Sequence, residues 1–188
     1  MSTLIGILGV ALFLALVALA VARLERRRRA EARRQEVLDA LAERFALAPA
    51  AERLIEGRVG SRRVRVGFET DYLLRGWIAL GSPALPPDVR VLELADGPYQ
   101  KHEELYFGAH PTGDKIFDAR FLVYCGTVEQ AQALPADLRG FLLTHPLDGL
   151  WLAGDEVSLP LPLEPAAAVS TLEQALAFCE SLEAALQR

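Results

Sequence analysis

The chain has 188 residues, a formal net charge of −5 and 24% charged residues. This composition, without a long low-complexity tract, excludes an intrinsically disordered chain and indicates an ordinary folded protein. Cys125 and Cys179 lie far apart, outside any CxxC or Cys/His cluster, and we expect both to be reduced and buried.

An apolar run occupies the beginning of the chain. Residues 4–22 have no charged side chain, and a helix of this length extends about 28 Å, close to the hydrocarbon core of a bilayer. We therefore expect a transmembrane helix over residues 1–22, with the lipid bilayer as its partner through residues 4–22. A cleaved signal peptide is the alternative, because Ala20-Val21-Ala22 has a small-x-small form. The absence of Lys and Arg before the run argues against cleavage.

A basic segment follows the apolar run directly. Its seven arginines are Arg23, Arg26, Arg27, Arg28, Arg29, Arg33 and Arg34. Against Glu25 and Glu31 they give residues 1–34 a charge of +5, which leaves −10 for residues 35–188. Because basic residues flank the cytoplasmic side of membrane segments, we expect the first five to orient a single-pass protein in the inner membrane with a cytoplasmic C-terminal domain. The acidic remainder argues against nucleic acid as a partner.

The helical pattern continues past the arginines. No Gly or Pro interrupts residues 23–48, and Pro49 is expected to end the helix. Apolar residues recur at helical spacing in its last turns, at Val37, Leu38, Leu41, Ala42 and Phe45. The pattern predicts a basic stalk helix over residues 23–48 whose end docks on the folded domain.

Residues 49–188 have the length of one domain and predict an α+β fold. Residues 54–59 and 63–69 form a predicted hairpin around Gly60-Ser61, and residues 73–80 and 89–94 are two further strands. We expect a mainly antiparallel sheet of about 6–7 strands, packed by one short helix and a C-terminal amphipathic helix.

The first hairpin carries a basic patch. Its arginines are Arg58, Arg62, Arg63 and Arg65. One interpretation is a site for lipid headgroups or another anionic ligand. The other is a solvated outer face of the sheet, which is common for exposed strands.

The loop before residue 114 is the least periodic part of the chain and the candidate region for an enzyme. His102, His110 and Asp114 are its acid/base candidates, within residues 96–114. The chain has no GxSxG, HExxH, P-loop or dinucleotide-binding glycine motif. Two histidines eight residues apart are a weak zinc pattern, so we expect neither a metal nor a cofactor.

The second half of the domain opens with a predicted strand over residues 117–125. It alternates from Phe117 to Cys125, and places Asp118 and Arg120 on the opposite face, close enough to pair. Two helices are expected next, over residues 127–134 with a capping box of Thr127 and Gln130, and over residues 135–143.

A second hairpin and a final helix complete the predicted fold. Residues 150–152 and 156–161 flank Gly154-Asp155, and Pro160 and Pro162 indicate an edge strand. Ser170 and Glu173 form a predicted capping box at the start of the C-terminal helix.

Several of these segments together resemble a group of uncharacterised bacterial membrane-anchored proteins with a small α+β domain of unknown function. The segments are the Gly57-Arg58-x-Gly60 hairpin, the Thr112-Gly113-Asp114 turn, Phe117 to Phe121, the Leu138 to Leu143 helix with Arg139, and Gly154-Asp155. The resemblance implies an architecture and a membrane setting, without an activity or catalytic residues.

The predicted function is therefore a single-pass membrane protein whose cytoplasmic domain is a protein- or membrane-surface-binding module. The alternative is a membrane-tethered enzyme with its active site near residues 96–114. A weak homodimer is compatible with the small residues four apart on the apolar run, Ala11 with Ala15 and Ala18 with Ala22.

Overall fold

The computed structural model describes residues 2–70, 73–94 and 108–187, with side chains from residue 16 onward. The elements in chain order are α1 (Ser2–Phe45), β1 (Ala48–Ala51), β2 (Leu54–Val59), β3 (Arg62–Phe68), β4 (Leu74–Ala79), β5 (Arg90–Glu93), β6 (Ala109–His110), α2 (Lys115–Asp118), β7 (Phe121–Tyr124), α3 (Val128–Gln132), α4 (Ala136–Thr144), β8 (Trp151–Ala153), β9 (Glu156–Leu161) and α5 (Pro165–Leu186). The predicted α+β class is confirmed.

All nine strands of the described residues join one sheet, in the order β1-β2-β3-β4-β9-β8-β5-β7-β6. Every strand pair is antiparallel, as predicted. The expected count of about 6–7 strands was too low. The two edge strands account for the difference, because β1 is a four-residue Ala/Pro segment and β6 has two residues. Segments this short have no alternation from which a strand can be predicted.

Helix α1 is one continuous element of 44 residues, as the uninterrupted pattern predicted. Its last turns belong to the core, since Val37, Leu38 and Leu41 are at most 4% exposed. The helix ends at Phe45, before Pro49. Ala46 has a left-handed backbone with φ of 54°, and the amide of Leu47 donates to the carbonyl of Ala42 over 3.0 Å.

The predicted transmembrane helix is not supported by the structure. Among the residues whose side chains the structure describes, which begin at residue 16, no helix is long and apolar enough to cross a membrane.

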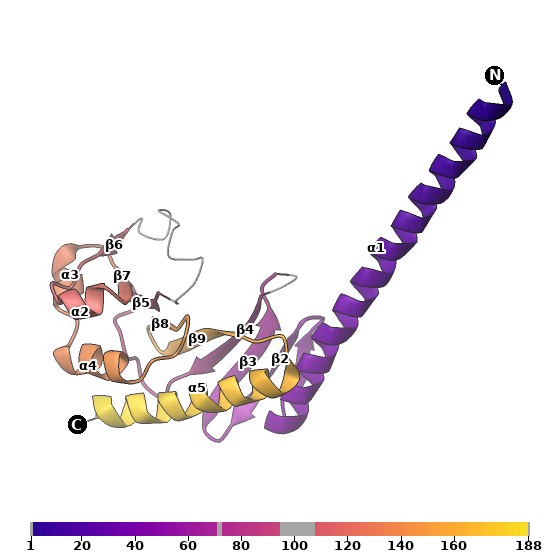
Figure 1. The fold of residues 1–188 in the computed structure, drawn as a ribbon. Coiled ribbons are helices and arrows are strands. Elements are labelled where there is room, and N and C mark those ends of the chain that lie inside the picture. Colours follow the sequence, from indigo (N-terminus) through magenta and orange to yellow (C-terminus); the bar gives the residue numbers. More distant parts are fainter. Residues whose placement is uncertain (1, 71–72, 95–107, 188) are drawn as a thin grey trace.

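Helix α5 covers one face of the sheet and lies beside the end of α1 (Figure 1). It packs against β4 and β9. At Gly76 of β4 the packing is close, because a Cβ atom there would lie 3.5 Å from the side chain of Leu172 in α5 and 3.3 Å from that of Leu161 in β9. The end of α1 is tied to α5 by Arg44, whose Nε donates to Glu173 over 2.8 Å. Buried apolar side chains of α1, α5 and the sheet form a single hydrophobic core.

The segment predicted as a strand over residues 117–125 begins as a helix instead. Asp114 caps α2 by accepting hydrogen bonds from the amides of Ile116 and Phe117 over 3.1 and 3.2 Å. The strand β7 starts only at Phe121. The alternation was misleading because Phe117 and Phe121, which a strand would place on one face, are also one helical turn apart. Their rings stack at 4.6 Å.

The predicted pair of Asp118 and Arg120 does not form. Asp118 accepts hydrogen bonds from the amide and the hydroxyl of Thr112, over 2.9 and 2.7 Å. Arg120 pairs with Glu93 on β5 at 2.6 Å. The prediction placed both side chains on one face of a strand. Because Asp118 lies in the helix α2 instead, the two side chains point in different directions.

The predictions for the chain after residue 125 are confirmed in part. Thr127 and Gln130 form the predicted capping box of α3, and the β8–β9 hairpin turns at Gly154 with φ of 57°. However, β9 is an interior strand between β4 and β8. Helix α5 begins at Pro165 with Glu164 as its cap, so Ser170 lies within the helix.

Candidate binding site at the base of the N-terminal helix

The four arginines of the predicted basic patch are not gathered into one unpaired cluster. Arg62 forms an ion pair with Glu183 of α5 at 2.6 Å, and Arg63 pairs with Glu56 of β2 at 2.9 Å. Arg65 pairs with Glu156 of β9 at 2.5 Å and lies 5.5 Å from the centre of the Trp77 ring. Carboxylates therefore neutralise three of the four side chains.

Arg58 differs from the other three arginines because it contacts a backbone carbonyl and not a carboxylate. Its guanidinium donates to the carbonyl of Ser61 over 2.9 Å, within the β2–β3 turn. Arg58 and Arg63 are opposite each other in the β2–β3 register, so these two exposed arginines are neighbours. The assignment of these arginines to a headgroup site stays a prediction.

The candidate enzyme region is described only in part. His102 lies outside the described residues. His110 is in β6, opposite Val123 of β7, and Asp114 is used as the cap of α2. Arg139 of α4 approaches Asp114 with Nε at 3.7 Å, while another nitrogen of its guanidinium donates to the carbonyl of Leu134 over 2.6 Å. The described part of this region thus stabilises turns and helix ends.

The remaining candidates for a chemical role are metal-ligand clusters and the two cysteines. No group of three or more His, Cys, Asp or Glu among the described residues is arranged to hold a metal ion. Cys179 is buried, and burial raises the pKa of its thiol to about 12. Cys125 is partly exposed, and its sulfur donates to the carbonyl of Thr127 over 3.1 Å.

A buried carboxylate lies on β5, away from these groups. Glu93 is 3% exposed, and its oxygens accept hydrogen bonds from Arg120 Nε over 2.8 Å and from the Leu147 amide over 3.1 Å. Burial raises the pKa of Glu93 above its ordinary value, and the hydrogen bond from Arg120 opposes this shift. The ion pair joins β5 to the residue before β7, and the hydrogen bond from Leu147 joins β5 to the loop before β8.

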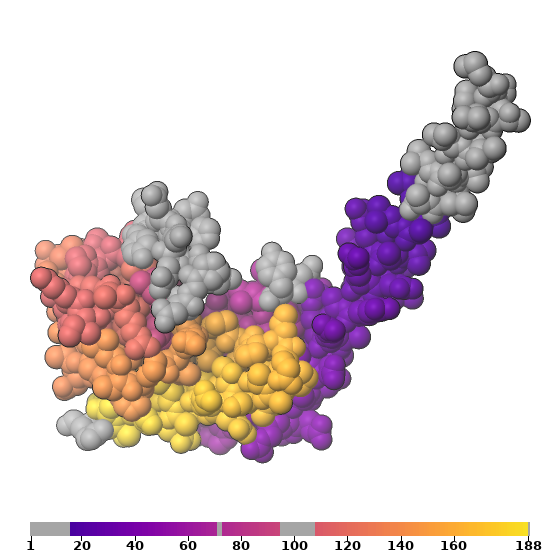
Figure 2. Space-filling model, viewed as in Figure 1, coloured from indigo at the N-terminus to yellow at the C-terminus, as the bar shows by residue number. Residues whose placement is uncertain are grey.

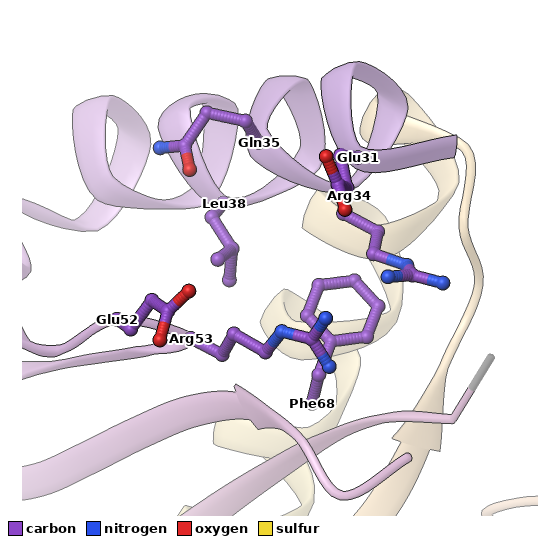
Figure 3. Close-up of a pocket in the computed structure, with 7 residues that line it drawn as sticks. All are labelled: Glu31, Arg34, Gln35, Leu38, Glu52, Arg53 and Phe68. Atoms are coloured by element: carbon purple, nitrogen blue, oxygen red, sulfur yellow. The ribbon is translucent and has the colours of Figure 1, made fainter. Parts of the chain in front are cut away.

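A cavity of about 200 Å³ lies where α1 leaves the domain. We call it the junction pocket, and its lining residues are Glu31, Arg34, Gln35, Leu38, Glu52, Arg53 and Phe68. The first four project from α1, and the last three come from the β1–β2 turn and the end of β3 (Figure 3). The pocket therefore has one wall on the helix and one on the sheet.

The junction pocket combines both signs of charge with an aromatic ring. The guanidinium of Arg34 lies 5.8 Å from the centre of the Phe68 ring, which is a cation–π distance. Figure 3 shows the Glu52 carboxylate facing α1 across the cavity. The amide of Phe68 donates to the carbonyl of Arg53 over 3.1 Å, which holds the β1–β2 turn against the end of β3.

Sequence reasoning did not identify this pocket. Glu31 and Arg34 were assigned only to the charge of the stalk, and the β1–β2 turn was not predicted because β1 was not predicted. The pattern offers one indication, since Arg34 lies four residues before Leu38 on the helix face that docks.

A second cavity of about 530 Å³ lies between α5 and the end of β9. Its walls are mostly apolar, with Leu147, Leu159 and Leu161 at its base, and Asp148 is its one charged lining residue. Apolar volume alone does not select a ligand, since orientation and specificity come from a few placed polar groups. The junction pocket is the smaller cavity, but it carries more of these groups.

The chain matches no protein-family model and no curated protein. Among solved structures, it is similar to the crystal structure of the mycobacterial trehalose monomycolate transport factor A, TtfA. The two chains are 13% identical with a TM-score of 0.45, and the match covers 78% of this chain and 82% of that one. A similarity at this level does not establish a shared fold or activity.

Proposed function

We propose that this chain is a binding module held at a lipid bilayer by the N-terminal part of α1. One observation carries the proposal, which is the exposure of apolar side chains on this helix. They are 43–57% exposed at Leu16, Val17, Leu19, Val21 and Leu24. Apolar side chains on all sides of a helix favour an apolar environment over water.

The arrangement of α1 supports this role. Its N-terminal part projects away from the body of the domain (Figure 1), and its side chains from residue 16 onward leave the body in the same direction (Figure 2). Its last turns are part of the core, because Leu38 and Leu41 are 4% and 0% exposed. The segment proposed to face the bilayer and the turns that pack in the domain thus belong to one continuous helix, without a linker between them.

The arginines after the apolar run support a membrane surface as the partner. Arg23, Arg26, Arg27, Arg28 and Arg29 are all exposed on α1. Each basic residue near an anionic membrane surface contributes about 1 kcal/mol to binding. Their position after the apolar run also favours the cytoplasmic side for the domain.

Vesicle flotation with the full-length chain tests the proposal. We expect the chain to float with vesicles of phosphatidylcholine and phosphatidylglycerol, and to lose this association in the Leu16→Arg/Leu19→Arg double variant. A charge deep in a bilayer costs about 2.5–3.5 kcal/mol per residue on insertion scales. The control is Ile116→Arg, which adds a charge at a 73% exposed apolar residue of the domain. Equal flotation of all three chains, or of none, would overturn the proposal.

A further inference from the structure

We propose that the second cavity, between α5 and the end of β9, binds a small apolar molecule that carries one ammonium group. We call it the α5–β9 cavity. This role goes beyond the membrane attachment proposed above and does not depend on it. Its basis is the size of the cavity, the way its wall is held, and the polar side chains in its lining.

The α5–β9 cavity has the dimensions of a small-molecule site. Its volume of about 530 Å³ lies within the range of about 300–1,000 Å³ that is usual for such sites. Leu147, Leu159 and Leu161 line its base and are only 7%, 1% and 5% exposed. An apolar group that enters the cavity therefore leaves water for an apolar surrounding.

The loop before β8 forms one wall of the cavity and is held from two sides. The amide of Leu147 donates to the buried carboxylate of Glu93 over 3.1 Å. Gly149 has φ of 70°, and a Cβ atom there would lie 2.9 Å from the ring of Pro160, so the loop lies directly on β9. Because this wall is already in place, a ligand does not have to order it on binding.

The prolines of β9 make a peptide strand a poor occupant. β8 pairs with β9 only as far as Ser158, whereas β4 pairs with it as far as Leu161, so the end of β9 has a strand on one side only within the described sheet. Pro160 and Pro162 line the cavity there, and neither has an amide hydrogen to donate to an added strand. A small molecule, which needs no ladder of backbone hydrogen bonds, fits this edge better.

The charges around the cavity favour a cation. Asp148 is the one charged side chain in the lining, and its carboxylate forms neither a hydrogen bond nor an ion pair with any described residue. The neighbouring carboxylate of Glu93 already has Arg120 as its partner. Burial is the main cause of the raised pKa of Glu93, and the charge of Asp148 adds to it, so the two carboxylates repel each other. An ammonium group at Asp148 would offset this repulsion.

Thr171 and Gln174 complete the polar part of the lining. They are three residues apart on α5 and so share one face of the helix. In the part of the chain that the structure describes, neither side chain makes a hydrogen bond. The hydroxyl of Thr171, the amide oxygen of Gln174 and the carboxylate of Asp148 are all acceptors, which suits the several donors of an ammonium group.

Titration calorimetry of the full-length chain in dodecyl maltoside tests the proposal, with tryptamine as the probe. The matched ligands are tryptophol, in which a hydroxyl replaces the ammonium, and indolepropionate, which has the opposite charge. We expect saturable binding of tryptamine that is at least about tenfold tighter than that of either. Asp148→Asn should remove this preference, whereas Asp155→Asn, at an exposed aspartate outside the cavity, should keep it.

A cavity-filling variant shows where the probe binds. Gln174→Trp places a large side chain in the cavity from an exposed position of α5 and should abolish tryptamine binding, while circular dichroism confirms that each variant is folded. No saturable binding, equal affinity for tryptamine and tryptophol, an unchanged preference in Asp148→Asn, or undiminished binding in Gln174→Trp would overturn the proposal.

A peptide arm separates a small molecule from a protein segment as the occupant. Tighter binding of the peptide acetyl-Leu-Lys-Leu-amide than of tryptamine would assign the cavity to a segment of another protein and would also overturn the proposal. Weaker binding of the peptide supports a small-molecule site. Because the titration needs no bilayer, its failure is distinct from a failure of the flotation test.

Discussion

Arg62 and Glu183 join the start of β3 to the last turn of α5 through two parallel hydrogen bonds of 2.7 and 2.6 Å. Their side chains are only 10% and 17% exposed, and Glu183 also accepts a hydrogen bond from the amide of Gly81. One carboxylate therefore fixes the β2–β3 hairpin, the end of β4 and the C-terminal helix. Arg62 is thus a structural residue within the predicted basic patch.

Glu183→Gln should lower the free energy of unfolding by about 1.5–3 kcal/mol, the usual contribution of a hydrogen bond to a charged group. The control is Glu173→Gln, which removes the partner of Arg44 at a site where both side chains are 44–62% exposed. Exposed ion pairs contribute about 0–1 kcal/mol. Urea unfolding followed by circular dichroism measures the free energy of unfolding of both variants. Equal decreases would contradict the conclusion that the pair of Arg62 and Glu183 stabilises the fold more than the exposed pair of Arg44 and Glu173.

The same carboxylate should give the stability a defined pH dependence. The hydrogen bond from Arg62 lowers the pKa of Glu183 below its ordinary value of 4.5. Its stabilisation is therefore complete above pH 4.5 and is lost as the pH falls through the lowered pKa. The difference in unfolding free energy between the wild type and Glu183→Gln should shrink as the pH falls below 4.5. A difference that stays constant down to pH 2 would contradict this mechanism.

Glu93 should produce a pH dependence of the opposite sign. Because burial raises its pKa above 4.5, the folded protein holds this proton more tightly than the unfolded chain. Its contribution is present below pH 4.5 and is lost as the pH rises through the raised pKa. As the pH rises from 4.5 through the raised pKa, the free energy of unfolding of Glu93→Gln should therefore increase relative to that of the wild type. Unfolding in urea at a series of pH values above 4.5 measures the gain, and a parallel pH profile for the two proteins would contradict it.

Leu41→Ala should cost about 2–5 kcal/mol of unfolding free energy, as expected for a fully buried leucine. The matched control is Leu24→Ala on the same helix, where the side chain is 52% exposed and the change should be small. Chemical unfolding of both variants in detergent tests whether the end of α1 is part of the core. A small effect of Leu41→Ala would mean that the helix is only loosely docked.

The two cysteines should differ in reactivity. Cys179 is buried with its thiol pKa raised to about 12, so it should stay unmodified by iodoacetamide at pH 8 in the folded protein. Cys125 is partly exposed and should react. Peptide mapping by mass spectrometry, with unfolded protein as the control, separates the two sites. Rapid labelling of Cys179 would show that α5 separates from the sheet.

The sequence allowed prediction of the parts of this fold that depend on local chemistry. The docking stripe from Val37 to Phe45 is set by helical spacing, and the capping box of Thr127 and Gln130 by a four-residue pattern. Gly60 and Gly154 supply the left-handed backbone, with φ of 61° and 57°, at the two predicted hairpin turns.

The errors arose where tertiary context overrides a local pattern. Pro160 and Pro162 indicated an edge strand, yet β9 is interior. Pro160 is tolerated because β8 pairs with β9 only as far as Ser158, so Pro160 has a single strand neighbour, Arg75 of β4. The junction pocket was not predictable for a similar reason, since its two walls come from segments brought together only by the docking of α1.

The most direct test of the central claim measures how deeply positions along α1 lie in a bilayer. Spin labels at Leu16→Cys, Arg27→Cys and Asp39→Cys, in a Cys125→Ser background, are compared for collision with oxygen and with a water-soluble nickel complex. We predict that the label at residue 16 is accessible to oxygen and protected from nickel, that residue 27 is intermediate, and that residue 39 is accessible to nickel. Equal nickel accessibility at all three positions would contradict a module held at the bilayer by α1.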